Sequence, residues 1–571
     1  MISCLSEIFR HYRNDLTKPS LRGTLLAMAI RFSSVLFALL ALCLSGCGQR
    51  ETPVERANQD RILLRANGTE PAALDPHLVT GVMEHNILTS LLEGLIRPDP
   101  KTLAPLPGVA EAWDISSDRR VYTFHLRPEA RWSNGDPVTA KDFIFSYERI
   151  LSPKLAAEYA SMLYPMVGAE AFNTGELTDF SQVGVKALDE HTLEITLKEP
   201  TPYFLSLLTH YTWFPVHPPT ILKHGEIDQR ESRWTRPGNF VGNGPFTLEE
   251  WRVHDYIDVK KNPLYWDRDS IWLNGVRFLP IDNRNTEERA FRSGQVHVTY
   301  AMPVHKIEPY KESGSEALLI SPYLGTYYYA INVNRPPLDD VRIRQALSLA
   351  IDRETITRNI TKAGQIPAPY FTPPDTAGYT AECPMSLDME QNIAEAQRLM
   401  AEAGYPNGEG MRDIELLYNT SDSHKPIAEA IQRMWQEHLG INATLLNKDW
   451  KTYLIARREG DFDIVRAGWI GDYNDPSTFL DLLTSWSGNN ASKWSTPDYD
   501  TLIREAAKTT DQTARYELFQ QAEAILMEEM PLIPIYFYVS AYLVDSSVQG
   551  WYPNILDQHP YQGIRLETAT D

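Results

Sequence analysis

Cysteine is scarce in this sequence. The 571 residues include four cysteines, and three of them lie at or before position 47. The rest of the chain keeps only Cys383, so no disulfide can form within it. No two cysteines have the C-x-x-C spacing of a zinc ribbon, which excludes that class of metal site.

Catalytic signatures are absent as well. The sequence contains no H-E-x-x-H, no G-x-S-x-G and no G-x-x-x-x-G-K-[ST] motif. With 75 acidic residues and 14 histidines, chance carboxylate pairs are certain and indicate nothing by themselves. We therefore expect no enzyme activity, no cofactor and no metal site.

Positive charge is in short supply. The chain has 54 basic against 75 acidic residues, a formal net charge of -21. A nucleic-acid-binding protein is expected to present a basic face, so nucleic acid is an improbable partner. Acidity mostly reports solubility and does not choose a ligand. At this length, two or three domains are expected.

Hydrophobic runs long enough to span a membrane are also missing, and the run at residues 35–44 has the features of a secretory signal peptide. Residues 35–44, VLFALLALCL, are ten apolar residues, fewer than the roughly 20 that span a bilayer. Arg31 precedes them and small residues follow, as in a secretory signal. The sequence LSGC, ending at Cys47, resembles a bacterial lipobox, in which Cys47 becomes the acylated first residue of the mature protein. The alternative is ordinary cleavage with an unmodified Cys47.

The boundaries of this leader follow from the lipobox. We expect residues 1–46 to be the signal peptide, with 1–27 an upstream extension or a misassigned start. Residues 47–59 are then a lipidated tether, flexible because the stretch after the cysteine is polar. Multiple acyl chains would hold the protein stably on a membrane.

One stretch in the C-terminal third has the residues of a ligand site. Residues 466–483, RAGWIGDYNDPSTFLDLL, follow a β-like run at 462–465 and place Arg466 and Asp472 in a glycine-rich turn, with a helix restarting after Pro476. Ligands of α/β sheets bind beyond the carboxyl ends of the strands. This pair suits a zwitterion, with its ammonium at Asp472 and its carboxylate towards Arg466. The alternative is that Asp472 caps its own backbone while Arg466 pairs on the surface.

The flanking periodicity predicts an α/β body. Apolar residues alternate along 414–418 and again along 441–445, as in strands. Between them, residues 424–439 have apolar side chains at four-residue steps and end at Gly440, as an amphipathic helix does. A strand–helix–strand unit of this length predicts a parallel pair.

A family resemblance begins in the first third of the chain. Residues 131–150, RWSNGDPVTAKDFIFSYERI, contain a tight-turn signal at Asn134-Gly135, then Thr139 as the N-cap of a helix with Asp142 at its third position. This segment closely resembles the signature of the bacterial peptide/nickel-type extracellular solute-binding proteins, family 5.

The resemblance covers about residues 60–566. It continues through LDPH (74–77), VKALDEHTLEITLKEPTPYF (185–204), GNGPFTLEEW (242–251), NPLYWD (262–267) and NVNRPPLDDVRIRQALSLAIDRE (332–354). The segments YLGTYYYAIN, LLYNTSDSHK, KDWKTYL and RAGWIGDYNDPSTFL are most similar to the oligopeptide-binding members of the family.

The resemblance implies an α/β, periplasmic-binding-protein-like fold (class II, cluster C), with two main lobes joined by a hinge and an extra domain. Such lobes close around a ligand by hinge motion. The expected divisions are lobe I at 60–92, 219–324 and 540–571, extra domain II at 93–218, and lobe III at 325–539.

The resemblance also implies the charged residues of the site. In the family, extended peptides lie between the closed lobes as an added strand, with hydrated pockets for their side chains. An aspartate that matches Asp472 holds the free amino group. The carboxyl ends of peptides of different length are met by residues that match Arg466, Arg457 and His424. The alternatives are surface salt bridges for the arginines and a helix-start cap for His424.

Aromatic residues complete the implied site. Trp450 and Trp469 match aromatics that line the groove, and either could instead be plain core. Tyrosines near the ligand are matched by four residues whose alternative role is packing alone: Tyr159, Tyr323, Tyr328 and Tyr538.

Two departures from the family pattern matter. The oligopeptide-binding members have a disulfide whose positions are Gly325 and Ile470 here, so that disulfide is missing. An acidic residue near the first side chains of the ligand is replaced by Thr80, which puts a preference for basic side chains in doubt.

Together these features predict a lipid-anchored, monomeric receptor for short peptides. We expect it in the periplasm, anchored to a membrane through Cys47 and delivering peptides to the permease of an ABC transporter. Murein peptide, dipeptide or metal-chelate binding on the same fold remains an alternative. A surface hydrolase and a signalling or adhesion role are alternatives of another class.

Overall fold

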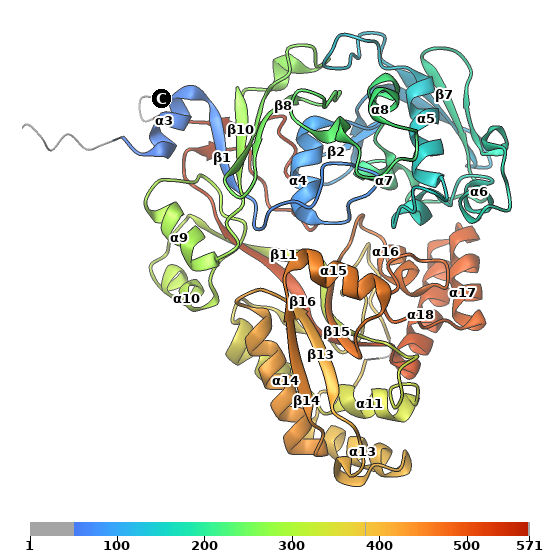
Figure 1. Cartoon of the computed structure of the whole chain (residues 1–571), viewed down its shortest axis with the longest axis vertical. Coiled ribbons are helices and arrows are strands. Elements are labelled where there is room, and N and C mark those ends of the chain that lie inside the picture. The colour runs from blue at the N-terminus through green and yellow to red at the C-terminus, as the bar shows by residue number, and fades with distance from the viewer. Residues whose placement is uncertain (1–50, 383, 569–571) are drawn as a thin grey trace, which may run out of the picture. The chain divides into compact units, whose positions relative to one another are not determined.

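The computed structural model describes residues 51–382 and 384–568, and from Pro53 onward the chain forms one compact unit (Figure 1). The predicted signal peptide and the lipobox with Cys47 lie outside the described residues. Among the helices that are described, none combines the length and the apolar character that crossing a membrane requires.

The first element is a helix where a flexible tether was expected. Helix α3 (Pro53–Asp60) buries Val54 and Ala57 against Leu64, and the Asn58 side chain lies 2.9 Å from Nε2 of His297. The tether prediction is therefore wrong for residues 53–59. Two apolar residues three positions apart give even this polar segment one face to bury.

A first sheet brings together distant parts of the chain. It has the order β1-β10-β9-β8, with β1 (Ile62–Ala66) parallel to β10 (Gly275–Leu279) and the other pairs antiparallel. Its remaining strands are β8 (Phe246–Arg252) and β9 (Tyr256–Lys261). Helix α4 (Val82–Leu91) contacts β8, and α9 (Arg284–Arg292) packs against Ala66 and Leu279 through Ala290. Helices α8 (Pro218–His224) and α10 (Val304–Glu312) belong to the same part of the chain, and Ile307 of α10 packs against Leu543.

A second sheet is formed entirely by residues 110–196. Its antiparallel order is β4-β5-β7-β6, and helix α5 (Ala140–Leu151) begins with the predicted capping box, in which Thr139 and Asp142 bond reciprocally. The elements of this region are β2 (Ile96–Pro98), β3 (Pro105–Pro107), β4 (Ala110–Ile115), β5 (Val121–Leu126), α6 (Ala169–Thr174), β6 (Val185–Ala187), β7 (Thr192–Thr196) and α7 (Phe204–Leu207).

The third sheet has six strands in the order β12-β16-β11-β15-β13-β14. As predicted, β13 (Ile414–Asn419) is parallel to β14 (Ala443–Lys448), and α14 (His424–Leu439) connects them and ends at Gly440, whose φ is +67°. Its other elements are β12 (Ile366–Pro367), β15 (Ile464–Ile470), α11 (Val341–Leu349), α12 (Arg353–Thr355), α13 (Met389–Glu402), α15 (Trp450–Glu459), α16 (Ser477–Leu480), α17 (Pro497–Lys508) and α18 (Gln512–Glu529).

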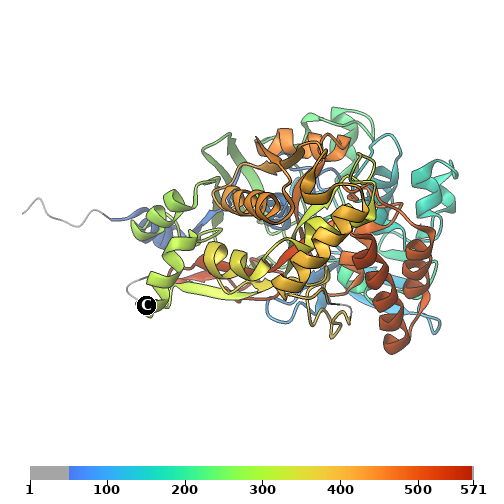
Figure 2. The ribbon, with the colours of Figure 1, turned by 90° about the horizontal axis from the view of Figure 1, so that it is seen from below.

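Two long antiparallel strands dominate this sheet. β11 (Leu318–Ile331) pairs with β16 (Leu532–Leu543) along nearly its whole length (Figure 2). The register shifts between Pro322 and Thr326 and again between Tyr327 and Tyr328. A small pair, β17 (Val548–Gln549) with β18 (Arg565–Leu566), follows. The expected domain boundaries at 324/325 and 539/540 fall inside the two long strands, and the domain division stays a prediction.

The segment expected as a glycine-rich turn is a strand in its first half. β15 continues through Arg466 to Ile470, because it pairs with β11 from Gly325 to Ile331. Gly468 permits this, since a Cβ there would lie 2.5 Å from the Tyr538 hydroxyl. The turn begins only at Gly471, and the helix predicted after Pro476 is the short α16.

Candidate functional site

The alternation of side chains along β15 sends the candidate residues to two faces. Arg466 lies over the Tyr327 ring at 4.6 Å. Trp469, three positions later, faces the opposite side, where its ring is 6.2 Å from that of Tyr159. Successive strand residues point to opposite faces, so the predicted residues form two groups around the end of β15.

Asp472 is the centre of the first group. Its side chain is 13% exposed, and its Oδ1 accepts a hydrogen bond from the Tyr159 hydroxyl at 3.3 Å. In the described part of the chain no lysine or arginine lies within 4 Å of it. Burial raises the pKa of Asp472 to about 7, and the Tyr159 hydrogen bond offsets part of that rise.

The turn-capping role considered for Asp472 belongs to its neighbour Asp475. Asp475 accepts hydrogen bonds from the backbone N–H and hydroxyl of Ser477 and forms an ion pair with Arg515 at 2.6 Å. The Asp472 backbone N–H instead donates to the Thr478 hydroxyl at 3.0 Å. The Asp472 carboxylate is thereby left facing Tyr159.

The sequence analysis missed His210, which completes this group. Its Nε2 lies 3.5 Å from Oδ1 of Asp472. Burial lowers the pKa of His210 well below its usual value, so the ring is neutral. Its Nδ1 accepts from the backbone N–H of Thr212, which leaves the proton on Nε2, facing Asp472. No sequence signal links these residues, because only tertiary structure brings them together.

Arg466 is the centre of the second group. Its guanidinium donates to the Tyr538 hydroxyl at 2.8 Å and to Asn419 at 3.3 Å, and Tyr323 lies edge-on to Tyr538 at 6.3 Å. Its Nε is buried without a hydrogen-bond partner, and no described carboxylate lies within 4 Å of the guanidinium. The surface ion pair considered for Arg466 is therefore not found among the described residues.

His424 belongs to the same group. It is the first residue of α14, it is buried, and its Nδ1 lies 3.3 Å from the Tyr327 hydroxyl. Burial lowers the pKa of His424 well below its usual value, and the charges of Arg466 and Arg284 lower it further. The imidazole is thus a neutral group within reach of two cations.

The three remaining candidates lie around α15. Burial raises the pKa of Tyr328 to about 12, and the positive charge of Arg457 lowers it in part. Arg457 thus interacts electrostatically with Tyr328. Trp450 stacks on Tyr453 at 5.4 Å. The Tyr453 hydroxyl donates to the backbone carbonyl of Arg466 at 2.5 Å, so Tyr453 connects Trp450 to the second group.

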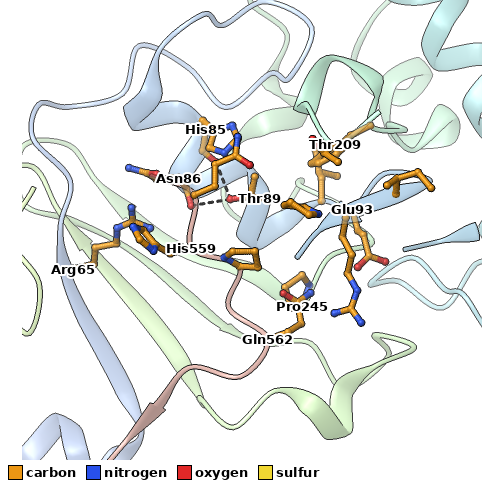
Figure 3. Close-up of a pocket in the computed structure, with 16 residues that line it drawn as sticks. Arg65, His85, Asn86, Thr89, Glu93, Thr209, Pro245, His559 and Gln562 are labelled. Carbon is orange, nitrogen blue, oxygen red and sulfur yellow. Dashed lines mark hydrogen bonds between the residues drawn. The ribbon is translucent and has the colours of Figure 1, made fainter. Parts of the chain in front are cut away.

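A separate small cavity contains none of the predicted site residues. It has a volume of about 40 Å³ and is lined by polar side chains that include Arg65, His85, Glu93 and His559 (Figure 3). One buried water needs a cavity volume of at least about 10–15 Å³. The cavity therefore has room for a few waters and not for an amino acid. It is not the candidate ligand site.

The charges of the two groups are complementary to one kind of ligand. Asp472 has no cation beside it, and Arg466 has no anion, among the residues that the structure describes. A buried charge is stable only when it is paired and hydrogen-bonded. A molecule with an ammonium at one place and a carboxylate at another would pair both.

Comparison with known proteins gives a consistent result. The family model described as bacterial extracellular solute-binding proteins, family 5 middle, matches residues 104–491. The periplasmic oligopeptide-binding protein OppA of Escherichia coli is 41% identical over 498 residues, which are 86% of this chain and 90% of that protein.

Solved structures agree. The chain matches Haemophilus influenzae OppA in complex with RPPGFSPFR with a TM-score of 0.84 at 35% identity, covering 89% of this chain and 99% of that one. It matches the E. coli murein tripeptide binding protein MppA with a TM-score of 0.83 at 36% identity, covering 88% and 98%. The match to the unliganded open form of MppA has a TM-score of only 0.62, although it covers 89% of this chain and 98% of that one. These matches confirm the α/β, periplasmic-binding-protein-like fold.

Proposed function

Because the chain belongs to family 5 of the bacterial extracellular solute-binding proteins, we propose that it captures short oligopeptides and delivers them to the permease of an ABC importer. Membership of this family makes the chain a binding protein and not an enzyme, as the sequence predicted. The energy for transport then comes from the transporter, so the chain itself needs no catalytic group.

The observation that carries this proposal is the unpaired Asp472. A free peptide would place its ammonium against Asp472, with Tyr159 and His210 beside it, and its carboxylate towards Arg466, Arg457 or His424 according to its length. A hydrogen bond to a charged group contributes about 1.5–3 kcal/mol. Leaving a buried ammonium unpaired costs about 3–5 kcal/mol.

The proposed setting follows the family. Its members are extracellular, and we propose a periplasmic monomer anchored by an acylated Cys47. In this proposal the first sheet lies in lobe I (60–92, 219–324 and 540–571) and the second in domain II (93–218). The third lies mostly in lobe III (325–539), and parts of β11 and β16 extend into lobe I. The poorer match to an open form supports the view that the described arrangement is the closed one.

Calorimetry with free and N-acetylated peptides tests the proposal. Tri- and tetrapeptides should bind, and their N-acetylated forms should not, because acetylation removes the ammonium. Asp472→Asn should weaken binding about a hundredfold or more, from the 3–5 kcal/mol above. Asp413→Asn, at an exposed aspartate, is the matched control. Equal binding of free and acetylated peptides would remove Asp472 from the proposed role.

A further inference from the structure

Arg284 is the first residue of α9, and this end of the helix contacts the loop between β13 and α14. Asn283, one residue earlier, caps α9 by accepting from the backbone N–H of Thr286 at 2.9 Å. The same side chain donates to Oδ2 of Asp422 at 3.0 Å. Asp422 is two residues before His424, so one asparagine fixes the first turn of α9 against the start of α14.

The charge of Arg284 reaches the groups that surround Arg466. Burial has the largest effect in lowering the pKa of His424; the charge of Arg466 comes next, and that of Arg284 lowers the pKa further. Burial raises the pKa of Tyr538, and Arg466 and Arg284 both oppose that rise. Arg284 therefore extends the positive region around Arg466 from the opposite side, since α9 flanks the first sheet whereas Arg466 belongs to the third.

Arg284 has no ion-pair partner among the described residues, although its charge lowers the pKa of Glu287, one turn further along α9, against the larger effect of burial. Its side chain has no described ion pair or hydrogen bond. Glu287, on the same helix, is buried and accepts from the backbone N–H groups of Tyr300 and Ala301, and burial raises its pKa to about 8. Asp422 is exposed and accepts from Asn283. The positive charge is thus free to take a carboxylate from a ligand.

We propose that Arg284 is a carboxylate-binding residue of the ligand site, which together with His424 holds a ligand carboxylate away from Asp472. The inference rests on the proposed function and adds a cation from the α9 side of the site. The carboxylate is either the terminus of a longer peptide or an acidic side chain, and a guanidinium binds both in the same bidentate way.

Matched ligand pairs, titrated into the full chain, test the inference. One pair is tetra-alanine with a free carboxyl end and its C-terminal amide. The others are tetra-alanine amides with Glu or Gln at the second or third position. Arg284→Gln should weaken the carboxylate member of at least one pair about tenfold or more and leave the neutral member within about twofold. Arg284→Lys keeps the charge but loses the bidentate geometry, so its affinity for the carboxylate member should lie between those of Arg284→Gln and the unsubstituted protein.

The pattern of losses identifies the source of the carboxylate. A loss confined to the free-acid pair identifies the peptide terminus, and a loss confined to the Glu/Gln pairs identifies an acidic side chain. Arg289→Gln, on the same helix, is the control. Arg284→Glu provides a second variant, which should prefer Lys over Glu in the same peptides.

The inference is wrong if Arg284→Gln, folded with an unchanged Tm, weakens both members of every pair equally or neither. It is also wrong if Arg284→Glu leaves the Lys-over-Glu preference unchanged. If the unsubstituted protein binds none of these peptides, the proposed function fails, and the inference fails with it. Peptide binding that Arg284→Gln does not alter would leave the proposed function standing without this residue.

Discussion

At the scale of single residues, the protonation of Asp472 should make ligand binding depend on pH. Burial raises its pKa from 3.8 to about 7, so below about pH 7 the empty site holds a proton. An ammonium ligand pairs with the ionised carboxylate, and the proton must leave first. The Kd for trialanine should therefore rise as pH falls from 8 to 5, by up to about tenfold per unit below the pKa.

Calorimetry in buffers of different ionisation enthalpy measures this proton release directly. Asp472→Asn should abolish the release along with most of the affinity. Asp481, whose pKa burial also raises to about 7, stays in the variant, and His210 has a pKa well below this range. A pH profile of the same steepness in both proteins would assign the titration to a group other than Asp472.

Residue by residue, the sequence predicted only what lies on one segment. Asp472 and Arg466 stand six positions apart after one strand, so their spacing alone suggested a zwitterion. His210 and Arg284 reach the site from other parts of the chain, and no local pattern distinguishes them from a core histidine or a surface arginine. Tertiary structure alone could reveal them.

At the scale of elements, periodicity predicted α14 correctly and failed at β15. Residues 424–439 have a repeating apolar face and a glycine stop, both local properties. The strand from Arg466 to Ile470 contains Gly468, which weakens a strand pattern, and it exists because β11 pairs with it. The polar helix α3 was missed for the same reason, since Leu64 supplies its packing partner.

The pairing of β11 with β15 leads to a prediction for this pair of strands. Gly325 and Ile470 are cross-strand partners, the positions that carry a disulfide in the oligopeptide-binding members. Gly325→Cys combined with Ile470→Cys should form that bond, because removing the Ile470 side chain frees the space 2.5 Å from a Cβ at 325. The bond should stabilise the protein by about 2–4 kcal/mol.

Thiol titration under denaturing conditions and thermal unfolding check the bond. The double variant should show two fewer reactive thiols than its reduced form, and a higher Tm. Gly325→Cys alone should lower the Tm, because its side chain meets Ile470 and the carbonyl of Trp469 at 2.9 Å. The same number of reactive thiols under oxidising and reducing conditions would mean that the strands are not paired in this register.

At the scale of the whole described unit, the sequence revealed neither a linker nor a boundary. The first sheet takes strands from residues 62–66 and 246–279, and β11 and β16 come from positions far apart in the chain. Such discontinuity leaves no compositional trace, because each strand is locally an ordinary strand. The expected lobes therefore came from the family resemblance alone.

An aromatic stack next to Asp472 connects residues 93–218 to the turn that follows β15 of the third sheet. Tyr203, which precedes α7, stacks on Tyr473 with ring centroids 5.1 Å apart and an interplanar angle of 5°. Arg515 lies over the Tyr203 ring at 5.0 Å and pairs with Asp475. Because Tyr473 follows Asp472 directly, binding of an ammonium and formation of this stack should support each other.

Tyr203→Ala should therefore weaken peptide binding without removing any contact to the peptide. An aromatic pair contributes about 0.5–1.5 kcal/mol beyond its area, so the Kd should rise about twofold to tenfold, mainly through faster dissociation. Tyr473→Ala should have a similar effect, and the double variant should bind no more weakly than the more affected single variant, because the stack needs both rings.

Stopped-flow dissociation of a fluorescent tripeptide measures the rates. Tyr552→Ala, at a tyrosine that is 38% exposed, is the control. Fully additive losses would show that the rings act separately, and closure would then depend on contacts other than this stack.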